Sequence, residues 1–262
     1  MIRYLRLIRT QLRVSVATAM QYRADFLVEG VMSLYWLGWN LLPLFILYAD
    51  RETVAGWDRA SALVVIAWFI VLRGLLEGLV NPSLVDVVER IRTGSFDYML
   101  LKPADTQFLV STSRFSPWRI VDVLGGFALV VYAFVQLGRA PTVGDVAAGL
   151  ILLGAGALVM YSLWIMIASA SFWVVRLDNL TFLLSAVFDT ARWPVQVFPG
   201  AWRFIFTFII PVAIMTTYPA KALLGTLDAS AALATLGGCV ALLIVSRMVW
   251  RTAIRSYTSA SS

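Results

Sequence analysis

Long runs of apolar residues alternate with short charged stretches along most of the chain. A hydrocarbon core of about 30 Å requires about 20 predominantly apolar residues in a helix. Five runs approach or exceed that length: Phe26–Tyr48, Ala60–Val80, Ile120–Leu137, Val146–Val175 and Ala231–Val249. The pattern predicts that all of them span a membrane, and that the fourth, which is the longest, tilts or projects beyond the lipid.

The region between Arg176 and Leu227 is harder to assign. It holds two apolar stretches, Leu180–Phe198 and Trp202–Leu224, and four prolines interrupt them: Pro194, Pro199, Pro211 and Pro219. Seven crossings would place the two termini on opposite sides of the membrane, whereas six would place both on the same side. With six crossings, fourteen basic residues share one side, as the positive-inside rule favours. We therefore expect six spans with both termini in the cytoplasm.

The proline-rich segment 199–225 is then expected to enter the outer leaflet and return. Proline breaks helices, and irregular backbone at membrane depth is tolerated where protein or a watery cavity covers it. The residues assigned to this re-entrant segment are Pro199, Arg203, Pro211 and Pro219. The alternative is a kinked helix that crosses completely. The predicted fold is an all-α polytopic membrane protein, with residues 1–262 forming a single transmembrane domain.

The first 25 residues carry a basic amphipathic pattern. At 100° per residue, Arg3, Arg6, Arg9 and Arg13 fall within an arc of about 120°, beside an apolar arc. Such a helix is suited to the cytoplasmic headgroup layer, where arginine attracts anionic lipid. The alternative is that these arginines only direct topology.

Composition excludes several classes of protein. Hydrophobic residues make up 60% of the chain and charged residues 14%, whereas soluble domains are about half apolar and a quarter charged. The chain has no histidine and one cysteine, so it can build neither a His/Cys metal site nor an intrachain disulfide. The net charge of +6 resides mostly beside apolar runs, which argues against nucleic acid as a partner. No phosphate-binding loop, catalytic Ser/His or Cys/His pair, or magnesium-type carboxylate cluster is evident.

The loop after the second span, residues 82–118, carries a short amphipathic helix. Asn81 followed by Pro82 is typical of a helix N-terminus, and Gly94 is typical of the residue that ends a helix. This loop is also predicted to be cytoplasmic.

The stretch that follows this helix places Phe96, Tyr98 and Leu101 beside charged residues. Apolar anchors rimmed by charge are typical of a docking surface. The alternative is that these side chains pack back against the helix bundle. The residues beyond 250 are expected to form a cytoplasmic tail.

Several charges fall inside the apolar runs. Each costs roughly 2.5–3.5 kcal/mol at mid-membrane, so they must face protein or a cavity. Arg73 and Glu77 are four residues apart, and Asp189 and Arg192 are three apart, so each couple is expected to form an ion pair. Glu29 and Asp122 lie near the cytoplasmic ends of their helices. All six are candidates for structural ion pairs or for the lining of a pathway.

Two motifs resemble one branch of the type-2 ABC transporter permeases. In the loop, the spacing of Gly94, Asp97, Leu100 or Leu101, and Pro103 is similar to the Gly-x-x-Asp-x-x-Leu-x-x-Pro-like signature of that branch. The second resemblance lies in the proline-broken region, in this order: Phe198-Pro199, Arg203, Phe208-Ile-Ile-Pro211, Tyr218-Pro219-Ala and Leu224-Gly225.

The resemblance implies a permease subunit that pairs with a second, identical or related permease and with two cytoplasmic ATPase subunits. ATP and magnesium would bind to the ATPases, and this chain would carry no cofactor and no catalytic residue. The cargo is not implied, but the direction would be export across the cell (inner) membrane. The helix Val85–Arg92 would be the coupling helix, and the implied ATPase-coupling residues are Val85, Val88, Glu89, Arg90, Arg92, Gly94, Asp97, Tyr98, Leu101 and Pro103.

Two alternatives to a permease are left open by the residues themselves. One is an ion-coupled secondary transporter, in which Glu29, Glu77, Asp122 or Asp189 would titrate. No inverted repeat supports it, and several of these acids have arginine neighbours. The other is a membrane scaffold that transports nothing.

Overall fold

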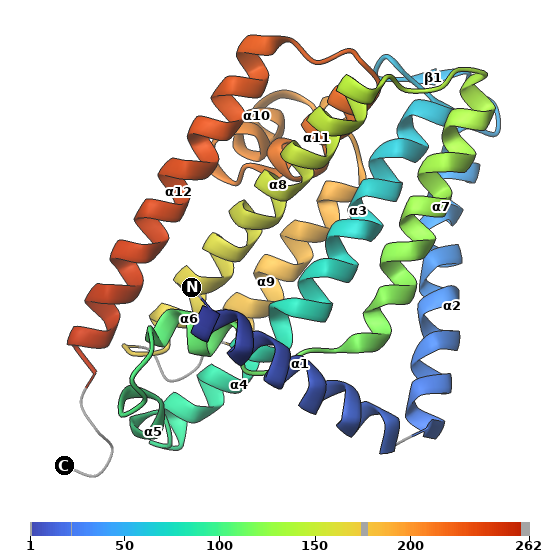
Figure 1. Ribbon diagram of the computed structural model, residues 1–262. Helices are drawn as coiled ribbons and strands as arrows, with labels where there is room; N and C mark the ends of the chain where they lie inside the picture. Colours follow the sequence, from blue (N-terminus) through green and yellow to red (C-terminus); the bar gives the residue numbers. More distant parts are fainter. Residues whose placement is uncertain (1, 22, 174–177, 258–262) are drawn as a thin grey trace.

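The protein is a bundle of long helices, shown in Figure 1 as a computed structural model that describes residues 2–21, 23–173 and 178–257. Within these residues, five helices are long and apolar enough to cross a membrane. They are α2 (Arg23–Leu47), α3 (Arg59–Leu79), α7 (Ile120–Leu137), α8 (Val143–Ala170) and α12 (Ala229–Arg255). The five predicted apolar runs are thus confirmed as helices.

Helix α3 forms the centre of the bundle. Of its most apolar window, 78% is buried, compared with 17% for α2 and for α12. Its most extensive contacts are with α7. A Cβ on Gly126 of α7 would lie 2.9 Å from the carbonyl oxygen of Ala67, so a glycine is what permits this close approach. The side chain of Asp58 caps the first turn of α3 by accepting hydrogen bonds from the backbone of Ala60 and Ser61.

The two ends of the bundle differ in structure (Figure 1). One end, which we call the α4 end, carries α1 (Ile2–Gln21), α4 (Asn81–Arg92), α5 (Asp97–Leu100) and α6 (Thr106–Ser111). The opposite end, which we call the hairpin end, carries strands β1 (Thr53–Val54) and β2 (Trp57–Asp58). These strands pair in antiparallel fashion through a turn in which Ala55 and Gly56 both have positive φ.

Helix α9 (Asp178–Asp189) occupies only the first part of the apolar stretch Leu180–Phe198. Its 12 described residues measure about 18 Å, and the four residues before Asp178 lie outside the described part of the chain. Short 3₁₀ turns follow at Thr190–Arg192 and Val195–Val197. The helix ends because Pro194 cannot continue it and because the Arg192 side chain donates a hydrogen bond to the carbonyl oxygen of Asp189 at 2.8 Å.

The segment after Pro199 forms two bent arms near the hairpin end (Figure 1). Residues Gly200–Ile209 and Ala213–Leu223 are inclined by 73° to each other, and the pair counts as a sixth candidate span only if it is one broken span. The first arm begins with α10 (Gly200–Phe204), and the second ends with α11 (Tyr218–Leu223). Next to the break, both arms are π-helical, a rare geometry that often marks functional positions.

Two predicted boundaries shift at the ends of long helices. Helix α8 occupies Val143–Ala170 in place of Val146–Val175, and Val175 and Arg176 lie outside the described residues. Helix α12 continues to Arg255, so the first residues of the predicted tail are helical. It continues because Trp250, only 1% exposed, packs against aromatic residues of the α4 end. Residues 258–262 lie outside the described part of the chain.

Candidate coupling surface and ion-pair network

Helix α4 continues directly from the core helix α3. Only Val80 separates them. Its N–H donates a hydrogen bond to the carbonyl oxygen of Leu76 in α3, and its carbonyl oxygen accepts one from the N–H of Leu84 in α4. The helix begins at Asn81 and Pro82, as the sequence predicts, but the N-cap position is occupied by Val80 and not by Asn81. The side-chain oxygen of Asn81 is buried without a hydrogen-bond partner. Because one hydrogen-bonded residue joins the two helices, a displacement of α4 is transmitted directly to α3.

The end of α4 agrees with the prediction from sequence. Gly94 has φ of +73°, a conformation that glycine adopts without strain. Its N–H donates to the carbonyl oxygen of Ile91, and the N–H of Phe96 donates back to Arg90 at 3.1 Å. This left-handed turn closes the helix and directs the chain into α5.

One face of the loop is anchored in the bundle. Phe96 is fully buried and meets the rings of Phe172, Trp250 and Tyr257 edge-on, at centroid distances between 5.4 and 6.4 Å. The expectation that Phe96 is an exposed docking residue is therefore wrong, because this pocket takes its large apolar ring out of water. Burial and the nearby charge of Asp97 raise the pKa of the Tyr257 hydroxyl.

The other face of the loop exposes apolar side chains. Val85 is 55% exposed, Tyr98 71% and Leu101 80%. We call these three residues the α4–α5 anchors. The charged residues Glu89, Arg92 and Lys102 are exposed on the same segment, as is Pro103. Large apolar side chains that protrude among charges at one end of the molecule resemble the core and rim of a protein interface.

The other predicted coupling residues hold the loop in shape. Arg90 forms an ion pair with Asp86 one turn earlier, at 2.5 Å, and Arg92 pairs with Glu89 at 2.8 Å. Val88 is half-buried beside them.

A second polar cluster, not anticipated from the sequence, ties the loop to α12. The guanidinium of Arg247 donates to both carboxylate oxygens of Asp105 and, at 2.6 Å, to the side-chain oxygen of Gln107. Asp105 also caps α6 by accepting from the N–H of Phe108. The hydrogen bond from Arg247 is the main cause that holds the pKa of Asp105 below its usual range.

The same cluster extends to α8 through Tyr161. Gln107 donates to the Tyr161 hydroxyl at 3.0 Å, and the hydroxyls of Ser111 and Tyr161 lie 2.8 Å apart. Asp105 and Arg247 are 142 residues apart in the chain, so spacing offered no signal. Arg247 late in the last apolar run is the feature of the sequence that points to this cluster, and the positive-inside rule accounts for it equally well.

Most of the charges within the apolar runs join one connected network. Both predicted pairs are present, Arg73–Glu77 at 3.0 Å and Asp189–Arg192 at 3.5 Å. Arg73 also reaches Asp189 at 3.5 Å and so joins α3 to α9.

Arg119 completes this network, although the sequence reading treated it only as a topology signal. It contacts Glu77 at 2.5 Å and Asp122 at 3.1 Å, which joins α3 to the start of α7. Asp122 is 9% exposed. The order of charges is Arg192, Asp189, Arg73, Glu77, Arg119, Asp122, in which each cation contacts an anion. We call these six residues the ion-pair network.

Glu29 lies close to this network without a described ion pair to it. It lines a cavity of about 580 Å³ together with Glu77, Asp86 and Arg119. The cavity lies at the junction of α3 and α4, near the α4 end.

The predicted outer segment is held against α8 by apolar contacts. Pro199 precedes α10, Pro211 lies at the break and Pro219 occupies the first turn of α11. A Cβ on Gly156 of α8 would lie 2.8 Å from the carbonyl oxygen of Met215, so the two backbones are nearly in contact. Arg203 is exposed.

These features define a polytopic helical membrane protein with anchored loops and paired charges. Among the described residues, no three of the His, Cys, Asp and Glu side chains are grouped so that they could hold a metal ion.

Comparison with known proteins identifies the family. Residues 34–261 match the profile of the ABC-2 family transporter protein, and the chain belongs to that family. It is therefore a membrane-embedded permease of an ABC transporter and not its catalytic subunit. A search of curated proteins and a search of solved structures each give no significant match.

Proposed function

We propose that this permease exports its cargo with energy from ATP hydrolysed on two cytoplasmic ATPase subunits, which dock on the α4–α5 anchors. The observation that carries the proposal is the exposure of Val85, Tyr98 and Leu101 on a loop whose opposite face is buried. A loop that only connected two spans would gain nothing by exposing these side chains to water. ATP and magnesium belong to the partner subunits.

The joint between α3 and α4 supports a mechanical role for the loop. When the ATPases close, α4 moves with them, and because a single residue links α4 to α3, the core helix follows. The ion-pair network then transmits the displacement to α7 and α9, while the Asp105–Arg247 pair transmits it to α12.

The exposure of the ion-pair network supports a second permease subunit. The side chains of Arg73 and Asp189 are 33% and 42% exposed in the single chain. In a lone subunit, such charges within the membrane would meet lipid at a high energetic cost. A second permease, identical or related, covers this face and forms with it a polar pathway for the cargo.

Helix α1 fits a position at the cytoplasmic headgroups. Its exposed apolar residues include Leu5, Leu12 and Met20, and its exposed arginines are Arg6, Arg9 and Arg13. Two contacts fasten it to the loop: the N–H of Asp105 donates to the Tyr4 hydroxyl, and that of Phe115 donates to Ser15.

The network argues against an ion-coupled transporter that uses Glu77, Asp122 or Asp189. Each of these three carboxylates contacts at least one arginine at 3.5 Å or less, so a guanidinium already occupies the place that a transported cation would need.

Replacement of the anchors tests the docking proposal. The variant Val85→Ala/Tyr98→Ala/Leu101→Ala should still insert, but it should bind the ATPase at least about tenfold more weakly, because central interface residues commonly contribute 1–2 kcal/mol each. ATPase co-purified from native membranes, and its activity in the complex, measure the effect. The matched control is Leu233→Ala/Val240→Ala/Ile244→Ala, which removes three equally exposed side chains from α12. Unchanged ATPase affinity in the anchor variant would refute the docking surface.

The direction of transport is tested in sealed inside-out vesicles. Export predicts that ATP drives a compound from a cell extract into the vesicles, whereas import predicts its release. An ion gradient without nucleotide should have no effect.

A further inference from the structure

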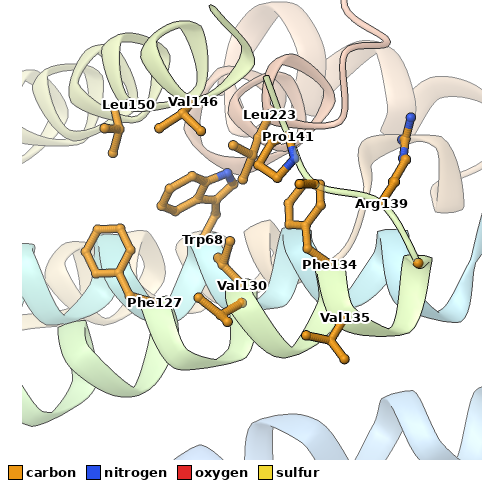
Figure 2. Close-up of a pocket in the computed structure, with 13 residues that line it drawn as sticks. Trp68, Phe127, Val130, Phe134, Val135, Arg139, Pro141, Val146, Leu150 and Leu223 are labelled. Carbon is orange, nitrogen blue, oxygen red and sulfur yellow. The ribbon is translucent and has the colours of Figure 1, made fainter. Parts of the chain in front are cut away.

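A lateral groove lies between α7 and α8 toward the hairpin end (Figure 2). A short loop, residues 138–142, joins the two helices, yet they hardly touch each other. Helix α7 packs on α3, while α8 packs on α11 and α12, so the two diverge along the bundle (Figure 1). The space between them is a cavity of about 590 Å³.

The groove has a buried floor and exposed walls. Trp68, Phe134 and Leu223 form the floor and are each less than 9% exposed. Its walls are apolar residues that the single chain leaves exposed, and they come from both helices: Phe127, Val131, Val135, Val146 and Leu150. Walls of this composition favour a hydrocarbon occupant over water.

The length of the groove matches one leaflet of a bilayer. From Phe127 to Gly138 the helix rises about 16 Å, and half of the hydrocarbon core is about 15 Å. A partner transmembrane helix would need a groove that extends through both leaflets. A single acyl chain that enters from the lipid at the hairpin end needs a groove through one leaflet.

A cation lies at the mouth of the groove. Arg139 follows Gly138 at the end of α7, and one of its nitrogen atoms donates to the carbonyl oxygen of Leu224 at 3.0 Å. Guanidinium has five N–H donors in total and binds phosphate well. Figure 2 places Arg139 beyond Phe134 and Pro141, at the end where lipid headgroups would lie.

We propose that this groove binds one acyl chain of an anionic phospholipid from the leaflet at the hairpin end, with the phosphate beside Arg139. The bound chain fills the gap between α7 and α8 and contacts the end of α11 through Leu223. This inference requires membrane insertion but does not depend on ATPase docking, so either proposal can fail without the other.

Photocrosslinking in proteoliposomes tests the site. The probe is a phosphatidylglycerol that carries a diazirine midway along one acyl chain, and mass spectrometry locates the adducts. Adducts should concentrate on Phe127–Val135 and Val146–Leu150, well above those on the equally exposed Val240 and Ile244 of α12. Adducts spread evenly over α2, α7 and α12 would overturn the proposal.

Variants separate the groove from its cation. Val131→Trp fills the groove and should abolish most labelling there, whereas Leu124→Trp, exposed on α7 outside the groove, should not. Arg139→Gln should lower the preference for phosphatidylglycerol over phosphatidylcholine by about fivefold. If Val131→Trp does not insert, the distribution of adducts on the wild-type protein is the test of lipid occupancy. Unchanged labelling in an inserted Val131→Trp protein, or adducts replaced by contacts with a second protein chain, would refute lipid occupancy.

Discussion

The two ends of this bundle are held together by different kinds of contact. At the α4 end, and in the part of the bundle next to it, charged side chains join helices across the structure, through the ion-pair network and through Asp105–Arg247. At the hairpin end, the bent arms rest on α8 through close backbone contact at Gly156. Ion pairs can join helices that move relative to each other, because long charged side chains can change conformation and keep their contact. Two backbones in contact at a glycine can move much less before they collide or separate.

The largest expected effect is at the hairpin end. Gly156→Ala places a Cβ 2.8 Å from the carbonyl oxygen of Met215, and overpacking of this kind costs about 3 kcal/mol when backbone must move. Thermal unfolding in detergent measures the loss. Gly154→Ala, on the same helix with nothing within 4 Å, is the control and should be neutral or slightly stabilising. Equal stability of the two variants would show that the bent arms are not held by this contact.

The next largest effect is expected from a substitution that breaks the ion-pair network. Arg119→Met leaves the buried carboxylate of Asp122 without its described partner, at a cost of about 2 kcal/mol in the free energy of unfolding. Adding Asp122→Asn should restore part of the loss, because the uncompensated charge is removed. The control Arg92→Met breaks an exposed pair with Glu89 and should cost less than about 0.5 kcal/mol. Additive effects in the double mutant would contradict a connected network.

The local parts of this network could be predicted from sequence, and the long-range parts could not. Arg73–Glu77 and Asp189–Arg192 follow from helical spacing, and the stop at Gly94 follows from the backbone freedom of glycine. The links from Arg119 to Glu77 and from Arg247 to Asp105 depend on which helices pack together, and no residue pattern in one chain encodes that.

Hydropathy was also insufficient in two places. It predicted one apolar stretch as far as Phe198, whereas the helix ends at Asp189, where Asp189, Arg192 and Pro194 interrupt that stretch. It also favoured an exposed position for Phe96, because a large aromatic residue beside charges in a loop is typical of an interface. Burial against Phe172 and Trp250 decides for the core.

The smallest expected effect concerns pH at the α4 end. The depressed pKa of Asp105 means that the carboxylate stabilises the fold above its unfolded pKa, about 3.9, and that this contribution is lost as pH falls through the lower folded pKa. Wild type should therefore be more stable than Asp105→Asn by a constant margin between pH 7 and 5, and the margin should close below about pH 4.

The Arg247→Met background is the control for this pH dependence. Without the guanidinium, the pH-dependent margin that Asp105→Asn produces should be much smaller in this range, because only the N–H of Phe108 and the charge of Arg251 still favour the carboxylate. A margin of unchanged size in that background would assign the effect to another group.

The most direct test of the account is the sidedness and shielding of the α4–α5 anchors. In a Cys239→Ala background, Leu101→Cys should resist a membrane-impermeant maleimide in intact cells and react in inside-out vesicles, while Arg51→Cys near β1 shows the reverse. Bound ATPase should then protect Leu101→Cys from the reagent. Labelling of Leu101→Cys in intact cells, or equal labelling with and without the ATPase, would contradict the proposal that this surface couples the permease to its energy source.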